Sequence, residues 1–85
     1  MPVTVLYFAS VKEKVGLAEE KVETPPSVVT VSDLMDWLAR RSPRHASAFA
    51  SRATIKSALD QVHVPASAAL GGAREVAFFP PVTGG

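Results

Sequence analysis

The sequence predicts an α+β fold in which one main helix packs across a mixed β-sheet. Three stretches support this fold. The run from Val3 to Phe8 has Thr4 as its one polar residue, which is typical of a central strand covered on both faces. A strongly amphipathic helix follows in the middle of the chain. The residues from Glu75 to Phe79 are again apolar and prone to β-structure, so strands flank the helix.

The residues between the first strand and the helix predict an edge strand. The connection from Ala9 to Leu17 is polar, has Gly16 near its end and leaves room for a helical turn. The next strand is predicted from Glu19 to Thr24. Its charged residues Lys21 and Glu23 suit a solvated sheet edge, and the two prolines that follow end it.

The helix signal is the strongest in the chain. Thr30 is a good N-cap, and Asp33 follows three residues later, as in a capping box. Arg40 and Arg41 are expected in the last turn, where positive charge complements the helix dipole, and Pro43 is expected to close the helix. The residues with helical spacing that should face the core are Val31, Leu34, Met35 and Leu38.

Residues 44–64 also carry a helical pattern, and on periodicity alone the whole stretch predicts helix. Small residues and the pair Gly71-Gly72 then predict a loop from Ala66 to Ala73, before the last strand. The apolar residues with helical spacing are Ala46, Phe49, Ala50 and Ala53, followed by Ile55, Ala58, Leu59 and Val62.

Composition excludes several classes of function. The chain has 85 residues, enough for one domain with a modest core and little room for an enclosed pocket. Nine Lys and Arg against eight Asp and Glu give no broad field for nucleic acid or an anionic membrane. There is no cysteine, so any sulfur chemistry has to use a sulfur atom from outside the chain. No apolar run approaches the roughly 20 residues of a membrane helix, and Met1–Thr4 lacks a signal-peptide start, so we expect a cytoplasmic protein.

Histidines, arginines and glycines offer three weaker candidate sites. His45 and His63 lack the further donors that a metal ion needs, so we expect surface or structural residues and no metal. Asp33 and Asp36 offset part of the charge of the four arginines between residues 40 and 52, which favours a solvated helix end. Gly71-Gly72 lacks the lysine and helix of a phosphate loop and predicts a turn.

The stretch of greatest functional interest is the tail from Pro80 to Gly85, which follows a domain predicted to span residues 1–79. Pro80 and Pro81 hold φ near about −65° and give the tail a direction. Gly84 and Gly85 leave no side chain near the terminal carboxylate, so the end of the tail suits a narrow channel. Extended, the tail spans roughly 20 Å and reaches into a partner's active site.

The run Glu75-Val76-Ala77-Phe78-Phe79-Pro80-Pro81-Val82-Thr83-Gly84-Gly85 resembles the C-terminus of the MoaD-like proteins, the sulfur-carrying small subunits of molybdopterin synthase. Val5-Leu6-Tyr7-Phe8-Ala9 resembles their first strand, and the resemblance covers essentially the whole chain. It implies a ubiquitin-like β-grasp fold with the first and last strands side by side. It also implies a strand from Ile55 to Leu59, a turn at Asp60-Gln61 and a short strand from Val62 to Val64.

The same resemblance implies a chemistry for the tail. An E1-like adenylating enzyme would use ATP to activate the Gly85 carboxylate, next to Gly84, and a persulfide sulfur would convert it to a thiocarboxylate. The large catalytic subunit of molybdopterin synthase would then take up the tail, and sulfur would pass to cyclic pyranopterin monophosphate to form the molybdopterin dithiolene. Alone, the chain would bind no cofactor and catalyse nothing. The residues expected at the interface are Phe79, Pro80, Pro81, Val82 and Thr83.

Three points stay open. A similar carrier could serve thiamine, cysteine or tRNA thiolation, and a ubiquitin-like modifier or interaction domain could be joined through Gly85 to partner lysines. The family carries acidic residues around one glycine before the last strand, whereas this chain has Gly71-Gly72-Ala73-Arg74, which leaves the partner in doubt. Phe78 and Phe79 point to opposite faces, so either one is core and the other belongs to an exposed patch, or both are core.

Overall fold

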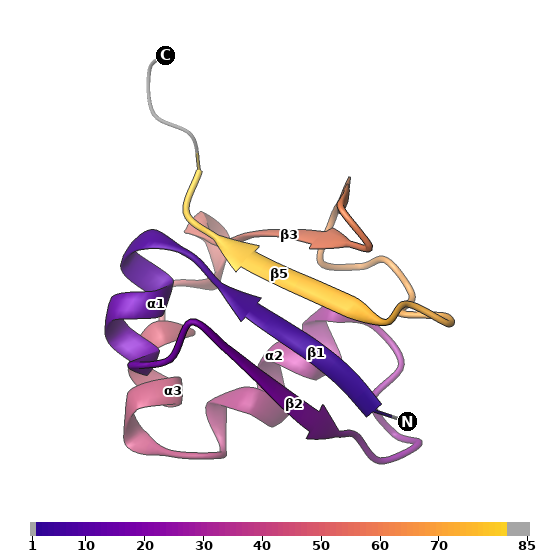
Figure 1. Ribbon diagram of the computed structural model, residues 1–85, viewed down its shortest axis with the longest axis horizontal. Helices are drawn as coiled ribbons and strands as arrows, with labels where there is room; N and C mark the ends of the chain where they lie inside the picture. Colours follow the sequence, from indigo (N-terminus) through magenta and orange to yellow (C-terminus); the bar gives the residue numbers. More distant parts are fainter. Residues whose placement is uncertain (1, 82–85) are drawn as a thin grey trace.

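The computed structural model describes residues 2–81, which contain one five-stranded mixed sheet. Across the sheet the strand order is β2-β1-β5-β3-β4. β1 and β5 are parallel and the other neighbours are antiparallel, so the first and last strands lie side by side, as expected for a β-grasp (Figure 1). The strands are β1 (Pro2–Tyr7), β2 (Glu19–Glu23), β3 (Lys56–Leu59), β4 (Val62–Val64) and β5 (Glu75–Phe79).

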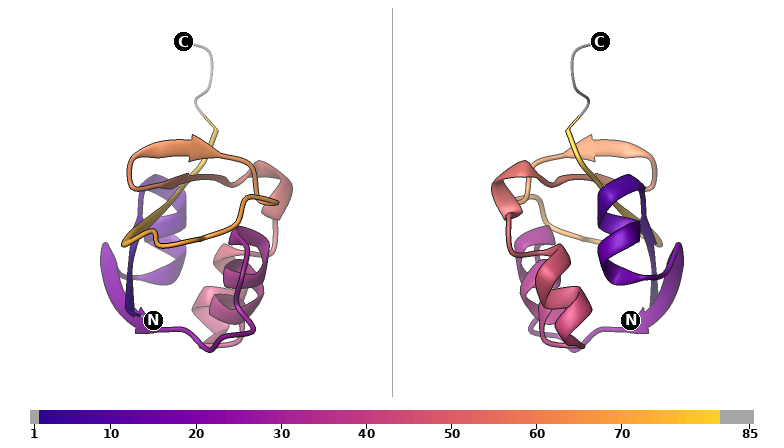
Figure 2. Two further views of the ribbon diagram at one scale, coloured as in Figure 1. Left: turned by 90° about the vertical axis from the view of Figure 1, so that its right-hand side faces the viewer. Right: turned by 90° about the vertical axis from the view of Figure 1, so that its left-hand side faces the viewer.

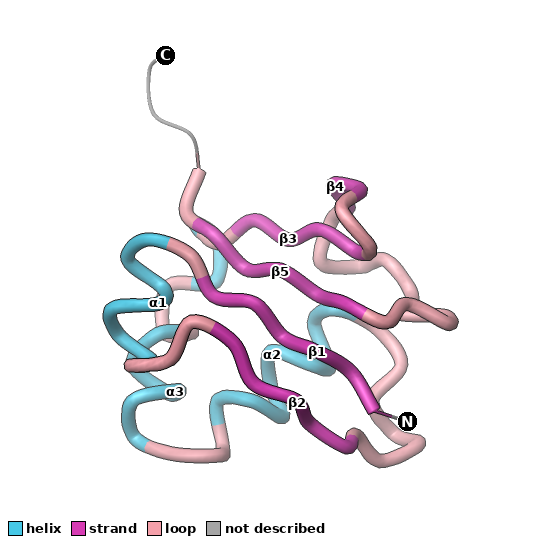
Figure 3. Tube along the Cα trace, in the orientation of Figure 1, coloured by secondary structure: helices cyan, strands magenta, loops and turns pink. Residues whose placement is uncertain are grey.

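The helices form a layer on one side of the sheet. They are α1 (Ala9–Val15), α2 (Val31–Ala39) and α3 (Pro43–Ala48), and a short 3-10 helix, η1 (Arg52–Thr54), precedes β3. The end-on views of Figure 2 separate α2 and α3 from the strands β1 and β2, and Figure 3 shows the same arrangement by type of element. α2 is the predicted main helix. The connection from Ala9 to Leu17, for which the sequence left room for a helical turn, contains α1.

The start of α2 confirms the predicted capping box. The Thr30 hydroxyl accepts a hydrogen bond from the Asp33 N–H at 3.1 Å, and the Asp33 carboxylate accepts one from the Thr30 N–H at 3.0 Å. Each bond satisfies a donor that the first turn of a helix would otherwise leave unpaired. The four apolar residues predicted to face the core are all buried.

The end of α2 differs from the prediction. The helix stops at Ala39, so Arg40 and Arg41 follow its last turn rather than lie in it. Pro43 does not close α2; it is the first residue of α3, after the N-cap Ser42. A proline fits there because the first N–H of a helix has no intrahelical partner to lose.

Residues 44–64 divide between helix and strand. Ala46 lies in α3 and Phe49 is its C-cap, which agrees with their helical spacing. From residue 55 onward the helical prediction is wrong, because β3 and β4 form an antiparallel hairpin, as the resemblance implied. Asp60 and Gln61 make its two-residue turn with φ of 47° and 72°, a backbone geometry that joins two twisted strands and cannot continue a helix.

The sheet has one buried face and one open face, which corrects the prediction that the first strand is covered on both sides. On the helix side, Val3, Val5 and Tyr7 of β1 are buried in the core together with Val76 and Phe78 of β5. Among residues 2–81, no helix covers the strands on the other side (Figure 2). We call this surface the open face; by strand register it comprises Pro2, Thr4, Leu6, Glu19, Lys21, Glu23, Lys56, Ala58, His63, Glu75, Ala77 and Phe79, and Phe8 continues it beyond β1.

The loop from Ala66 to Ala73 runs beside the start of α2, where the Ala66 carbonyl accepts the Ser32 N–H at 2.9 Å. Gly71 has φ of 57° and open space around it, so Gly71-Gly72 forms a turn, as predicted. Asp60 fixes the start of β5, since its Oδ1 accepts the N–H groups of Arg74 and Glu75 at 3.0 Å each.

Candidate functional site

The root of the tail lies where β5 leaves the sheet. Phe78 is fully buried and packs against Tyr7 and Phe49, with ring centroids 6.5 and 5.1 Å away. Phe79 is half-buried, lies on the open face and is not part of the core. The two rings therefore belong to opposite sides of the sheet. The alternative in which both are core is wrong, because Phe79 is not part of the core cluster and no helix in residues 2–81 covers its side of the sheet (Figure 2).

The tail itself is described only at its start. Pro80 is half-buried and Pro81 is exposed, directly beyond the last strand. The other predicted interface residues, Val82 and Thr83, and the predicted reacting residues Gly84 and Gly85 lie outside the described residues. The structure thus places the base of the tail at the end of β5, where Phe79 lies on the open face and Pro80 lines a small pocket with residues of α1 and α3.

The open face is apolar at its centre. Leu6 on β1 and Ala77 on β5 are neighbours in register, and Ala58 on β3 continues the row. Phe8 lies next to this row and is 48% exposed, which is high for a phenylalanine. Its N–H donates to the Phe78 carbonyl at 3.1 Å, so it lies beside the strand from which the tail leaves. An exposed aromatic in such a place suits docking against another protein.

Phe8 was missed as a site residue in the sequence. It ends a strand whose apolar residues all looked buried, and its neighbour Tyr7 is indeed in the core. Two features of the sequence could have indicated that Phe8 is exposed: the polar residue Ser10 that follows it, and the alternation of faces along a strand. Alternation places Phe8 opposite Tyr7, and only the position of the helices shows that this side is open.

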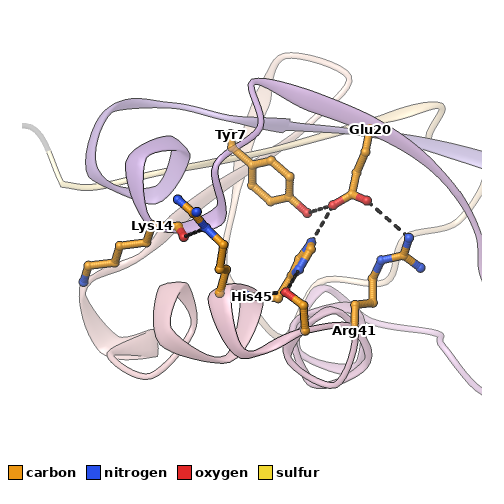
Figure 4. Close-up of polar contacts among 7 residues, drawn as sticks. Tyr7, Lys14, Glu20, Arg41 and His45 are labelled. Atoms are coloured by element: carbon orange, nitrogen blue, oxygen red, sulfur yellow. Dashed lines mark hydrogen bonds and ion pairs between the residues drawn. The ribbon is translucent and has the colours of Figure 1, made fainter.

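A buried polar cluster on the helix side was also missed (Figure 4). Glu20 lies at its centre. Its Oε2 accepts a hydrogen bond from the Tyr7 hydroxyl at 2.7 Å and lies 2.7 Å from His45 Nε2, while its Oε1 is 3.3 Å from Arg41 Nη2. His45 Nδ1 lies 2.7 Å from the Ser42 hydroxyl. The cluster ties the edge strand β2 to α3, so His45 is a structural residue, one of the two predicted possibilities.

The surroundings shift the pKa values within this cluster. Burial and the hydrogen bond to the negatively charged Glu20 raise the pKa of Tyr7 far above its ordinary value. Burial by itself would raise the pKa of Glu20. Hydrogen bonds from His45 and Tyr7, with the positive charge of Arg41, outweigh burial and lower the pKa of Glu20. At neutral pH Glu20 is therefore an anion, which accepts a hydrogen bond from the Tyr7 hydroxyl and forms an ion pair with Arg41.

The arginines that follow α2 are mostly engaged within the chain. Arg41 pairs with Glu20 and lies over the Trp37 ring, and Arg52 pairs with Asp36. Arg44 donates to the carbonyl oxygens of residues 13 and 14, at the end of α1, where a positive charge stabilises a helix. These contacts favour structural roles over an interface for nucleic acid.

Residues 2–81 contain neither a metal site nor a membrane-spanning helix. No group of three or more His, Cys, Asp or Glu side chains in this part of the chain is placed to hold a metal ion. Nor does any helix in the same range have the length and apolar character that crossing a membrane requires. The open face and the root of the tail remain the candidate site, and its apolar chemistry suits docking and presentation of the tail.

Comparison with known proteins finds relatives that match nearly the whole chain. Residues 5–85 match the ThiS family. Two bacterial proteins named molybdopterin synthase sulfur carrier subunit are similar over nearly their whole length. The one from Escherichia coli is 39% identical over 83 residues, covering 98% of this chain and 99% of that protein. The one from Haemophilus influenzae is 31% identical over 81 residues, covering 95% and 96%.

Solved structures share the fold. A putative molybdopterin converting factor, subunit 1, from Pyrococcus furiosus has a TM-score of 0.75 and 27% identity, over 96% of this chain and 99% of that one. SAMP1 from Haloferax volcanii has a TM-score of 0.73 and 26% identity, and the whole of both chains is covered. The ubiquitin-like β-grasp expected from the sequence is therefore confirmed.

Proposed function

The chain belongs to the ThiS family, and from that premise we propose that it is the sulfur carrier subunit of a molybdopterin synthase. The observation that carries the proposal is its similarity to the two bacterial carrier subunits, which extends over nearly their full length. The open face supports it, because an apolar docking surface leads directly into the base of the tail.

The chemistry of the proposal concerns the carboxylate of Gly85. An anionic carboxylate is a poor electrophile, so an E1-like enzyme attaches AMP from ATP to it and releases pyrophosphate. A persulfide sulfur displaces AMP, and a second thiol cleaves the resulting acyl disulfide to leave a thiocarboxylate. The thiocarboxylate is ionised at neutral pH and nucleophilic, and it passes its sulfur to cyclic pyranopterin monophosphate. The chain has no cysteine, so the sulfur comes from its partners.

In this proposal the two subunits have different roles. The carrier contributes the tail and the docking surface, and the large subunit binds the pterin substrate and catalyses the transfer. Phe79 and Phe8 are the aromatic anchors on the carrier side, with Pro80 and Pro81 directing the tail into the partner. The chain is therefore not an enzyme by itself, and ATP is a substrate of the activating enzyme.

A second candidate is a protein modifier joined through Gly85 to lysines of other proteins. The fold shared with SAMP1 and with small archaeal modifier protein 1, both from Haloferax volcanii, supports this candidate. Carriers for thiamine, cysteine or tRNA thiolation use the same activated tail and differ in the acceptor. The intact mass of the protein purified from its own host separates these classes. Replacement of one oxygen by sulfur supports a carrier, and isopeptide adducts without a thiocarboxylate support a modifier.

The experiment that tests the reacting group changes the length of the tail. Deletion of Gly85 moves the carboxylate back by about 3.3 Å, and a misplacement of about 1 Å can cost 100-fold in rate. Addition of one alanine after Gly85 overshoots and brings a Cβ into the channel. Both variants should fold and bind the large subunit but fail in sulfur transfer to the pterin precursor. Normal turnover with either variant contradicts the proposal.

A further inference from the structure

A hollow of about 640 Å³ lies at the edge of the open face, beside β3 and β4. Lys56 is the register partner of Phe79, and the His63 ring lies 5.1 Å from the Phe79 ring, so both side chains adjoin the base of the tail. The residues around the hollow include Arg52, Ile55, Lys56, His63 and Pro65. Lys56 and His63 thus join the hollow to the proposed docking surface and give it a basic side, while Ser57 and Val64, which also line the hollow, lie on the helix side of the strands.

The basic groups there differ in whether they are already paired. Arg52 forms an ion pair with Asp36 of α2, so its charge is largely compensated. Lys56 and His63 are both exposed, and in residues 2–81 no ion pair involves either of them. Two basic side chains without acidic partners therefore flank an aromatic anchor.

We propose that Lys56 and His63 select the partner: the surface that docks on the open face carries carboxylates that enter this hollow. The inference rests on the proposed carrier function and adds the charge of the partner to it. Protein interfaces combine an apolar centre with a polar rim, and here Leu6, Phe8 and Phe79 supply the centre. The basic rim then attracts an acidic partner surface to this edge and sets the orientation in which the tail enters the partner.

The opposite edge of the same face provides a matched control. Lys21 on β2 is the register partner of Thr4, so it also lies on the open face, but β1 and β5 separate it from the hollow. Lys56→Glu and Lys21→Glu change the net charge by the same amount, and both positions are exposed. A difference between the two variants therefore reports position rather than total charge.

The experiment measures binding of each variant to the large subunit from the same host, at low and high salt, with thermal unfolding as a check of folding. Lys56→Glu should weaken binding at low salt by at least about tenfold, because it puts like charges opposite each other. Lys21→Glu should change it by less than about twofold. The effect of Lys56→Glu should shrink as salt rises, since screening weakens exposed charge pairs. His63→Gln should weaken binding in the same direction by a smaller factor.

Four results overturn the inference. Equal effects of the two charge reversals mean that the hollow is not a specific contact. An effect of Lys56→Glu that is independent of salt means that the contact is not electrostatic. Normal binding by Lys56→Glu, with wild-type protein that binds and transfers sulfur, rejects the inference and leaves the carrier function intact. Wild-type protein that neither binds the large subunit nor carries a thiocarboxylate rejects both.

Discussion

Two neighbouring phenylalanines should respond to the same substitution in opposite ways. Phe78 is fully buried between Tyr7 and Phe49, whereas Phe79 lies outside the core. Phe78→Ala should cost about 3–5 kcal/mol of folding free energy, the usual loss for a buried phenylalanine. A domain of 85 residues has about 4–13 kcal/mol in total, so this variant is close to unfolding. Phe79→Ala should cost less than about 1 kcal/mol, because it leaves no cavity in the core.

Binding should show the reverse order. Phe79→Ala should weaken the complex with the large subunit by more than about 1 kcal/mol while the free protein stays folded. Urea unfolding followed by the fluorescence of Trp37 gives the folding free energies, and titration calorimetry gives the affinities. Equal losses of stability at the two positions would refute the assignment of the rings to opposite faces. Unchanged affinity of Phe79→Ala would remove that residue from the interface.

The remaining predictions concern the helix layer and the polar cluster. Leu34 is fully buried in α2, so Leu34→Ala should cost about 2–5 kcal/mol in urea unfolding, and a loss below about 0.5 kcal/mol would place it outside the core. The lowered pKa of Glu20 means that its ionised form stabilises the fold. This contribution is complete above the ordinary glutamate pKa of about 4.3 and is lost as pH falls through the lower value of the folded state. The stability difference between wild type and Glu20→Gln should therefore be constant above about pH 5 and shrink as the pH falls below about 4, and a difference that stays constant down to about pH 3 would contradict the role of Glu20.

The parts of the fold that could be predicted depend on residues close together in the sequence. The capping box of α2 joins Thr30 to Asp33, and its core residues repeat at helical spacing. The last strand is predicted from five consecutive residues, and its place beside β1 agrees with the resemblance. Local signals of this kind are strong because each one reports a short-range interaction.

The parts that were missed depend on distant residues. Glu20 is joined to His45 across 25 positions in the sequence and to Arg41 across 21, and nothing in the local sequence marks these contacts. The helical spacing from Ile55 to Val62 was misleading, because a short apolar run can fit helix or strand and the turn at Asp60 decides. The open face was missed for a similar reason. It depends on which side of the sheet the helices occupy, and that is a property of the whole fold.

The position of β5 has a mechanical consequence for a protein that works through its tail. β5 is hydrogen-bonded to β1 on one side and to β3 on the other. In residues 2–81 it is the strand that joins the pair β2–β1 to the pair β3–β4. A pull on the tail therefore loads both ladders along their length, so several hydrogen bonds resist together. A force that peeled an edge strand such as β4 from the sheet would instead break the hydrogen bonds of that strand one at a time. A partner that draws the tail into a channel thus holds the domain by its most firmly anchored strand.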